Sequence, residues 1–249
     1  MSETHPIAGP TTASPTREPT WGLPDALVGW GAAFVFANLV GALVLLLGGY
    51  QTKAEIEGAP LAWVMLSSLP IWIAFVAIAI GVSRIKGNGW VSDFPARFRP
   101  VDLLIGVPAG LVAQFILVPV ISFPILQLSG QDADDLAKPA QDLADKAHGA
   151  GGAILLLLVV GVVAPLAEEL FFRGLLFRAL EKKWAQWWAL GLSSAFFAFP
   201  PFQPLQFLPL VAAGAVFGGV MIWTDRLGTA VVAHMAFNIS TVVLLLWLS

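Results

Sequence analysis

Residues 164–180 read APLAEELFFRGLLFRAL, and this stretch decides how the rest of the chain is interpreted. It places two adjacent carboxylates, Glu168 and Glu169, and the guanidinium of Arg173 in an otherwise apolar run, and the residues from Ala153 to Leu166 carry no charge. Charged groups at the centre of a membrane helix cost about 2.5–3.5 kcal/mol each, so they are functional candidates by default. On a helix, Glu169 and Arg173 share a face and can pair, which leaves Glu168, about 100° round the axis, free to face another partner.

The composition predicts that this helix lies in a membrane. Apolar residues make up 57% of the 249 residues and charged residues only 12%, whereas ordinary soluble domains are about 25% charged. A soluble enzyme is therefore excluded, and one integral membrane domain is the simplest organisation. The chain contains no cysteine, so neither disulfides nor thiolate chemistry can contribute to its function.

The distribution of apolar runs predicts an all-α fold, a polytopic transmembrane helical bundle of about seven spans, within a range of six to eight. Residues 1–20 are rich in Pro, Thr and Ser and predict a disordered amino-terminal tail, followed by an integral membrane domain at 21–249. Three prolines predict that the third span is bent or broken, and the acidic segment 129–149 predicts a short surface helix. The expected spans lie at 26–47, 61–82, 101–128, 154–180, 185–199, 205–224 and 229–247.

Lysine and arginine residues are distributed unevenly between the two sides of this topology. Ten of them lie on the side of the amino terminus and three, Lys53, Lys138 and Lys146, on the other. Because cytoplasmic loops carry an excess of Lys and Arg, the bias predicts a multi-pass protein with a cytoplasmic amino terminus, most simply in the cell membrane. The Glu168–Glu169 pair then lies towards the cytoplasmic half of the bilayer.

A second polar pair, His234 and Asn238, lies on the last expected span. The two residues are four apart, so they share a helix face. At 1.5 Å per residue, His234 lies roughly 7–8 Å from the cytoplasmic end of its span, and Glu168 lies about 9 Å from the same side of a ~30 Å core. A carboxylate, an imidazole and an amide are therefore expected to meet in one cavity, which is what activation of water or metal binding requires. The residues alone leave open that Glu169 and Arg173 form only a structural pair and that His234 only packs.

The EExxxR pattern closely resembles the first motif of the CAAX-protease and bacteriocin-processing family of intramembrane proteases, also called type II CAAX prenyl endopeptidases. The pair His234 and Asn238 resembles the HxxxN motif of that family. The resemblance implies a glutamate-dependent protease that cleaves peptides near the cytoplasmic face. In this role Glu168 activates water, and Glu169 and Arg173 hold Glu168 in position. His234 and Asn238 bind a metal or stabilise the oxyanion. The catalytic residues implied are Glu168, Glu169, Arg173, His234 and Asn238.

The chain departs from the family pattern at one motif, FxxxH, which lies between the other two. Phe197 matches its Phe, but Pro201 stands where the His is expected, and a proline side chain cannot bind a metal. Of the three histidines, only His234 lies in an expected span. The resemblance therefore leaves Glu168 and His234 as ligands for a divalent metal such as zinc.

These observations favour an intramembrane endopeptidase or metalloendopeptidase whose protease-like core is 154–249. The alternative is a catalytically impaired family member that binds a peptide or a lipid tail in the same polar cavity. A transporter is a third hypothesis, suggested by the bent third span, but no repeat between the two halves supports it. The expected partners are membrane lipid and a peptide or protein substrate, which can itself be lipidated, and not a nucleic acid.

Overall fold

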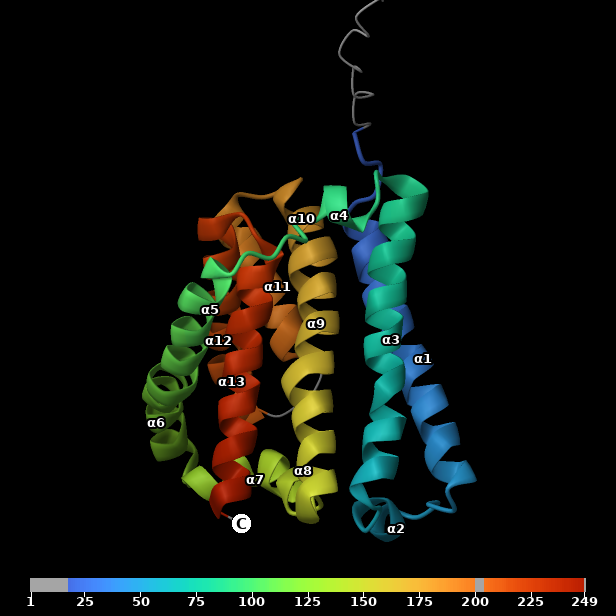
Figure 1. The fold of residues 1–249 in the computed structure, drawn as a ribbon, viewed down its shortest axis with the longest axis vertical. Helices are drawn as coiled ribbons and strands as arrows, with labels where there is room; N and C mark the ends of the chain where they lie inside the picture. The colour runs from blue at the N-terminus through green and yellow to red at the C-terminus, as the bar shows by residue number, and fades with distance from the viewer. Residues whose placement is uncertain (1–17, 200–203, 249) are drawn as a thin grey trace, which may run out of the picture.

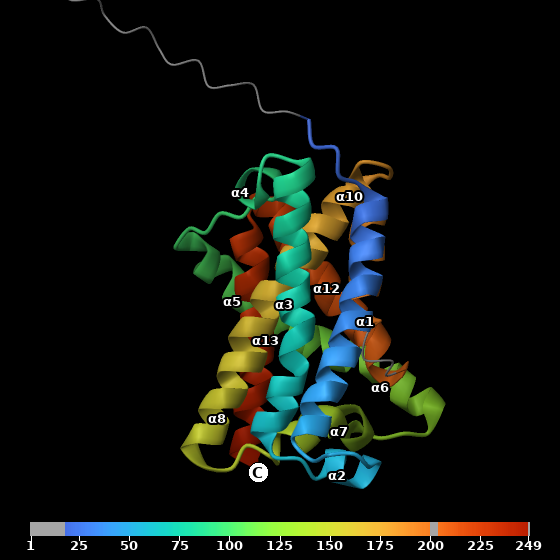
Figure 2. The same cartoon turned by 90° about the vertical axis from the view of Figure 1, so that its right-hand side faces the viewer.

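In the computed structural model, which describes residues 18–199 and 204–248, every regular element is a helix, so the predicted all-α class is confirmed (Figures 1 and 2). The first two spans, α1 (Leu23–Leu47) and α3 (Leu61–Lys86), form a hairpin. The loop between them contains a short helix, α2 (Lys53–Glu57), because Thr52 and Glu55 satisfy its first backbone N–H groups in a capping box.

The third span continues through its prolines instead of breaking. It consists of α5 (Val101–Val112), the π-helical turn η1 (Ala113–Leu117) and α6 (Val118–Ser129). In the π turn the N–H of Val118 donates to the carbonyl of Ala113, five residues earlier. Since Pro119 has no N–H to donate, the wider turn accommodates the proline without interrupting the helix.

The acidic segment forms the expected surface helix, α7 (Ala133–Ala144), which lies across the lower end of the bundle in Figure 1. Its amino-terminal cap is Asp132, whose carboxylate accepts from the N–H groups of Asp134 and Asp135 at 3.0 Å. Beyond its other end, Lys146 donates to the carbonyl oxygens of Glu57 and Ala59, which ties this end to the α1–α3 hairpin.

The stretch with Glu168 and Glu169 lies inside the longest helical run, 33 residues from Gly149 to Glu181. At 1.5 Å per residue this run is about 50 Å long, so it exceeds the ~30 Å core of a bilayer, as expected. Two π-helical turns interrupt its α-helical geometry. Its parts are α8 (Gly149–Leu158), η2 (Val159–Val163), α9 (Ala164–Glu169), η3 (Leu170–Leu176) and α10 (Phe177–Glu181).

Three further helices complete the bundle: α11 (Gln186–Ala198), α12 (Pro204–Thr224) and α13 (Leu227–Leu248). With only 13 residues, α11 reaches about 20 Å and is too short to cross a bilayer alone. The other expected spans correspond to six helical runs in the described residues that are long and apolar enough to do so. The chain is therefore an integral multi-pass membrane protein.

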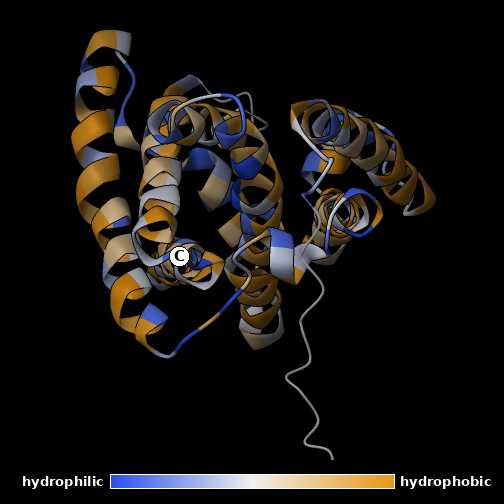
Figure 3. Ribbon diagram, turned by 90° about the horizontal axis from the view of Figure 1, so that it is seen from above, coloured by the Kyte–Doolittle hydropathy of each residue, from blue (hydrophilic) through white to orange (hydrophobic). Residues whose placement is uncertain are grey.

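The central helix, α13, packs against α5, α9 and α12. Its approach to α5 depends on glycine, because a Cβ atom at Gly110 would lie 2.1 Å from the carbonyl oxygen of Ala233. Seen from above in Figure 3, the α1–α3 pair stands to one side of the remaining helices. Apolar side chains such as Leu39 and Leu47 are exposed along this pair, as a lipid-facing surface requires.

The last residues of the expected tail make contacts at the upper end of the bundle, where α1 begins and α10 ends. The Nζ of Lys182 lies 3.7 Å from the centroid of the Trp21 ring and donates to the carbonyl of Pro19 at 3.0 Å. The Trp21 indole donates to Asp93 at 2.9 Å. Burial lowers the pKa of the Lys182 amine. Residues 1–17 lie outside the described part, so for them the tail stays a prediction.

We expect the upper end of the bundle to face the cytoplasm, because eight of the described Lys and Arg side chains outside the central network gather there. Single cysteines introduced into this cysteine-free chain should show directly which end of the bundle faces the cytoplasm. Lys183→Cys should react with a membrane-impermeant maleimide only after the cells are opened, and Ser249→Cys should react in intact cells. Although α11 does not cross the bilayer alone, α13 ends at the lower end of the bundle, opposite the end where α1 begins (Figure 1). Protection of the carboxyl terminus in intact cells would therefore contradict this topology and would add or remove one crossing.

Candidate active site

The centre of the site is a buried network around Glu169, whose side chain is fully excluded from solvent in the bundle. Its Oε1 accepts from Nη1 of Arg173 at 3.0 Å and lies 2.9 Å from Nδ1 of His234. A second guanidinium nitrogen, Nη2, donates to the carbonyl of Gly214 at 2.8 Å. A Cβ atom at Gly214 would lie 2.8 Å from Nη2, so any other residue there would force the bonded guanidinium to shift. The network therefore joins the long helix to α12 and α13.

Aromatic rings enclose this network. The His234 ring stacks on Phe217 with a centroid separation of 4.7 Å, and Phe197 meets it edge to face at 5.2 Å. The guanidinium carbon of Arg173 lies 4.7 Å from the centre of the Phe197 ring, within the range of a cation–π contact. Phe197, the residue that matches the FxxxH motif, thus contacts both the arginine and the histidine.

Glu168 points away from this network and into a cavity. Its side chain keeps 22% of its surface exposed, its Oε1 accepts from the Trp72 indole at 3.0 Å, and its Oε2 lies 3.8 Å from Nε2 of His234. The imidazole therefore stands between the two carboxylates, with Nδ1 towards Glu169 and Nε2 towards Glu168. Trp72 is not among the site residues predicted from the sequence, where its signal is an indole near the middle of a span instead of at an interface.

Asn238 lies one turn beyond His234 and ties α13 to the π turn η2. Its Nδ2 donates to the carbonyl of Val160 at 2.8 Å. In a π turn that carbonyl would accept from the N–H five residues later, but that residue is Pro165, which has none. Pro165 therefore leaves the carbonyl of Val160 without a backbone donor, and the side-chain amide of Asn238 donates to it instead.

The cavity next to Glu168 has a volume of about 600 Å³, within the usual range for ligand sites. His234 and Asn238 line it on the α13 side, and the α1–α3 hairpin contributes polar side chains as well as apolar ones. The polar residues are Asn38, Ser67 and Ser68. None of them is predicted as a site residue from the sequence, although the amide of Asn38 in the middle of a span is an unusual polar group that could have indicated it.

The described donor atoms do not form a metal site. A catalytic zinc takes three protein ligands, whereas Glu168 and His234 supply two, and no group of three His, Cys, Asp or Glu in residues 18–199 and 204–248 could hold an ion. His148 is exposed at the start of α8, and the side chain of Gln206, a further possible oxygen ligand, donates from its amide nitrogen to the carbonyl of Leu136. Pro201 lies outside the described residues.

Comparison with known proteins agrees with the two outer motifs. Residues 150–240 match the family model of the type II CAAX prenyl endopeptidase Rce1-like proteins. No curated protein and no solved structure matches the chain. The matched segment contains Glu168, Glu169, Arg173, His234 and Asn238, and it covers less than half of the chain. Over residues 150–240 the chain is therefore similar to the Rce1-like, type II CAAX prenyl endopeptidases, the same family that its two motifs resemble.

Proposed function

We propose that the protein is an intramembrane endopeptidase in which Glu168 is the general base that activates water. The observation that carries the proposal is the difference between the two carboxylates. Glu169 is buried and paired with Arg173, whereas Glu168 borders the cavity and lacks a cationic arginine or lysine partner among the described residues. Only Glu168 is therefore placed to exchange a proton with a water molecule.

The proposed reaction uses the imidazole to hold the geometry. A water molecule next to Oε2 of Glu168 gives its proton to the carboxylate as its oxygen attacks the peptide carbonyl. The protonated Glu168 then passes the proton to the departing amine. Glu169, which is 2.9 Å from Nδ1, fixes the His234 ring so that Nε2 faces the cavity. Because a carboxylate only accepts, Nδ1 carries the hydrogen of this bond, and an Nε2–H that stabilises the oxyanion is present when both ring nitrogens are protonated. Asn238 sets the position of this turn of α13 against η2.

The polar side of the α1–α3 hairpin supports a peptide as the substrate class. An extended peptide carries N–H and C=O groups that need partners in an apolar site. Asn38 uses its Nδ2 to bond the carbonyl of Phe34 at 2.8 Å, and its Oδ1 accepts from no described residue. Together with Ser67 and Ser68 it offers hydrogen-bonding groups across the cavity from Glu168. We propose that a substrate, lipidated or not, enters from the membrane at the cytoplasmic side.

A peptidase assay on the purified protein tests this function. Peptides that end in a CAAX sequence, with and without a prenyl group, should be cleaved near their carboxyl end, and mass spectrometry of the products should locate the bond. We expect a chelator to leave the rate unchanged, because the described donors supply only two metal ligands. Loss of cleavage on chelation would instead show a metal site completed outside the described residues. Binding of the peptides without any cleavage would favour the catalytically impaired alternative.

A further inference from the structure

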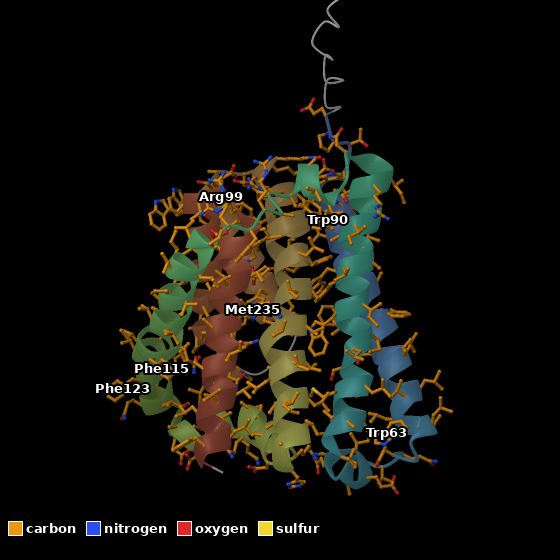
Figure 4. The ribbon with its side chains drawn as sticks, in the orientation of Figure 1. Trp63, Trp90, Arg99, Phe115, Phe123 and Met235 are labelled. Atoms are coloured by element: carbon orange, nitrogen blue, oxygen red, sulfur yellow. The ribbon has the colours of Figure 1, made fainter. Side chains whose placement is uncertain are left out.

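An apolar groove of about 500 Å³ lies on another side of the long helix, between α3, α9 and α13. It shares no lining residue with the cavity that contains Glu168. Leu166, on the wall of this groove, is 48% exposed, so the groove is accessible from the hydrocarbon region. Figure 4 shows Met235 on α13 near the middle of the bundle and Trp90 at its upper end. The apolar lining includes Val76, Ile80, Leu166, Leu170, Val231 and Met235.

The upper mouth of the groove is basic. Arg97 lines it together with Trp90. On α3, Val76, Ile80 and Arg84 follow at intervals of four, so Arg84 lies one turn beyond the apolar lining on the same face. Both arginines are exposed, and neither makes an ion pair with a residue in the described part of the chain. Two guanidinium groups thus flank the point where the groove reaches the membrane surface.

We propose that this groove binds an anionic phospholipid, with an acyl chain against α3, α9 and α13 and the phosphate between Arg84 and Arg97. Apolar lining at the depth of the acyl chains and positive charge at the depth of the headgroups match the two parts of such a lipid. Basic pockets between spans bind acidic headgroups in this way, and a guanidinium binds phosphate oxygens through two parallel hydrogen bonds. Trp90 provides the interfacial aromatic group that commonly accompanies them.

Two other cations at this end do not serve the same purpose. Lys86 is paired with Asp25 and Arg226 with Asp102, so their charges are already compensated. Lys183 is exposed and lies outside the groove lining, which makes it a matched control for a change of one positive charge at the same end.

Native mass spectrometry of the delipidated protein tests the proposal without reference to peptidase activity. Phosphatidylglycerol and phosphatidylcholine with identical acyl chains are added in equal amounts, and the bound lipids are counted. We expect phosphatidylglycerol to bind several-fold more than phosphatidylcholine. Arg97→Gln and Arg84→Gln should each lower its binding about fivefold, whereas Lys183→Gln should leave it unchanged. Met235→Trp, which fills the groove, should lower the binding of both lipids, with a thermal melt to show that the variant is folded.

Three results would overturn the site. The first is equal binding of the two lipids by the unsubstituted protein, and the second is an equal loss in Arg97→Gln and Lys183→Gln. The third is full competition by millimolar inorganic phosphate, which would mean that the arginines bind a free anion and that the groove plays no part. None of these results depends on whether the chain cleaves peptides, so the lipid site and the proposed function fail independently.

Discussion

Replacement of Glu168 by glutamine is expected to lower kcat for peptide cleavage by a factor of about 10² to 10⁴, the usual contribution of a general base. The amide has nearly the same size as the carboxylate, and its carbonyl oxygen can still accept from the Trp72 indole, a bond of 3.0 Å in the present structure. It cannot accept a proton from water. The rate loss should therefore come with almost no change in melting temperature, measured on the same detergent-solubilised preparation.

Trp72→Phe provides the companion variant, because it keeps an aromatic ring in α3 but removes the N–H that holds Glu168. We expect a smaller decrease in kcat, with KM for the peptide nearly unchanged. An unaltered kcat in Glu168→Gln would show that this carboxylate is not the base, and the proposed mechanism would have to be given up.

Arg173→Ala is expected to lower the free energy of unfolding by about 3–5 kcal/mol, because it leaves the buried carboxylate of Glu169 without its cationic partner. The substitution also removes the donor to the carbonyl of Gly214 and leaves a space next to Phe197. Glu169→Gln should also lower the free energy of unfolding, because it leaves the guanidinium of Arg173 without its anionic partner. Unfolding in mixed detergent, followed by tryptophan fluorescence, measures the free energy of unfolding of both variants.

Arg178→Ala is the matched control on the same helical run. Arg178 pairs with Glu181 at 2.8 Å, but both side chains remain partly exposed. Its loss should therefore cost about 1 kcal/mol or less. If Glu168→Gln proved more destabilising than Arg173→Ala or Glu169→Gln, the division into one chemical and one structural carboxylate would be wrong.

Helical periodicity and depth explain why part of the site could be predicted from the sequence. Spacing of four residues brings Arg173 to Glu169, and equal depth in two spans brings His234 to the same level as the carboxylates. Neither argument decides which carboxylate the imidazole bonds. Glu168 and Glu169 differ by about 100° on the helix, and only the packing of α13 against α9 turns Nδ1 towards Glu169.

The contacts from the α1–α3 hairpin could not be predicted in the same way. Trp72 and Glu168 are 96 positions apart in the chain, and no local pattern links them. Asn38 belongs to a helix whose packing partner is not encoded in its own periodicity. Prolines in the third and fourth spans indicate irregular helices. They do not distinguish a break from a π turn, because in either geometry the backbone bond that the proline cannot donate is no longer required.

The π turn η2 has a consequence for how this protein can change in length. It contains one residue more than an α-helical turn would use over the same rise. Deletion of one residue from η2 would let the helix close into a regular α turn over nearly the same rise and rotation, so Glu168 and Glu169 would keep their orientation relative to α8. Deletion of one residue from the regular turns of α8 would instead rotate both carboxylates by about 100° relative to the residues before the deletion. The π turn η2 is therefore a place where this helical run can lose one residue without misaligning the site.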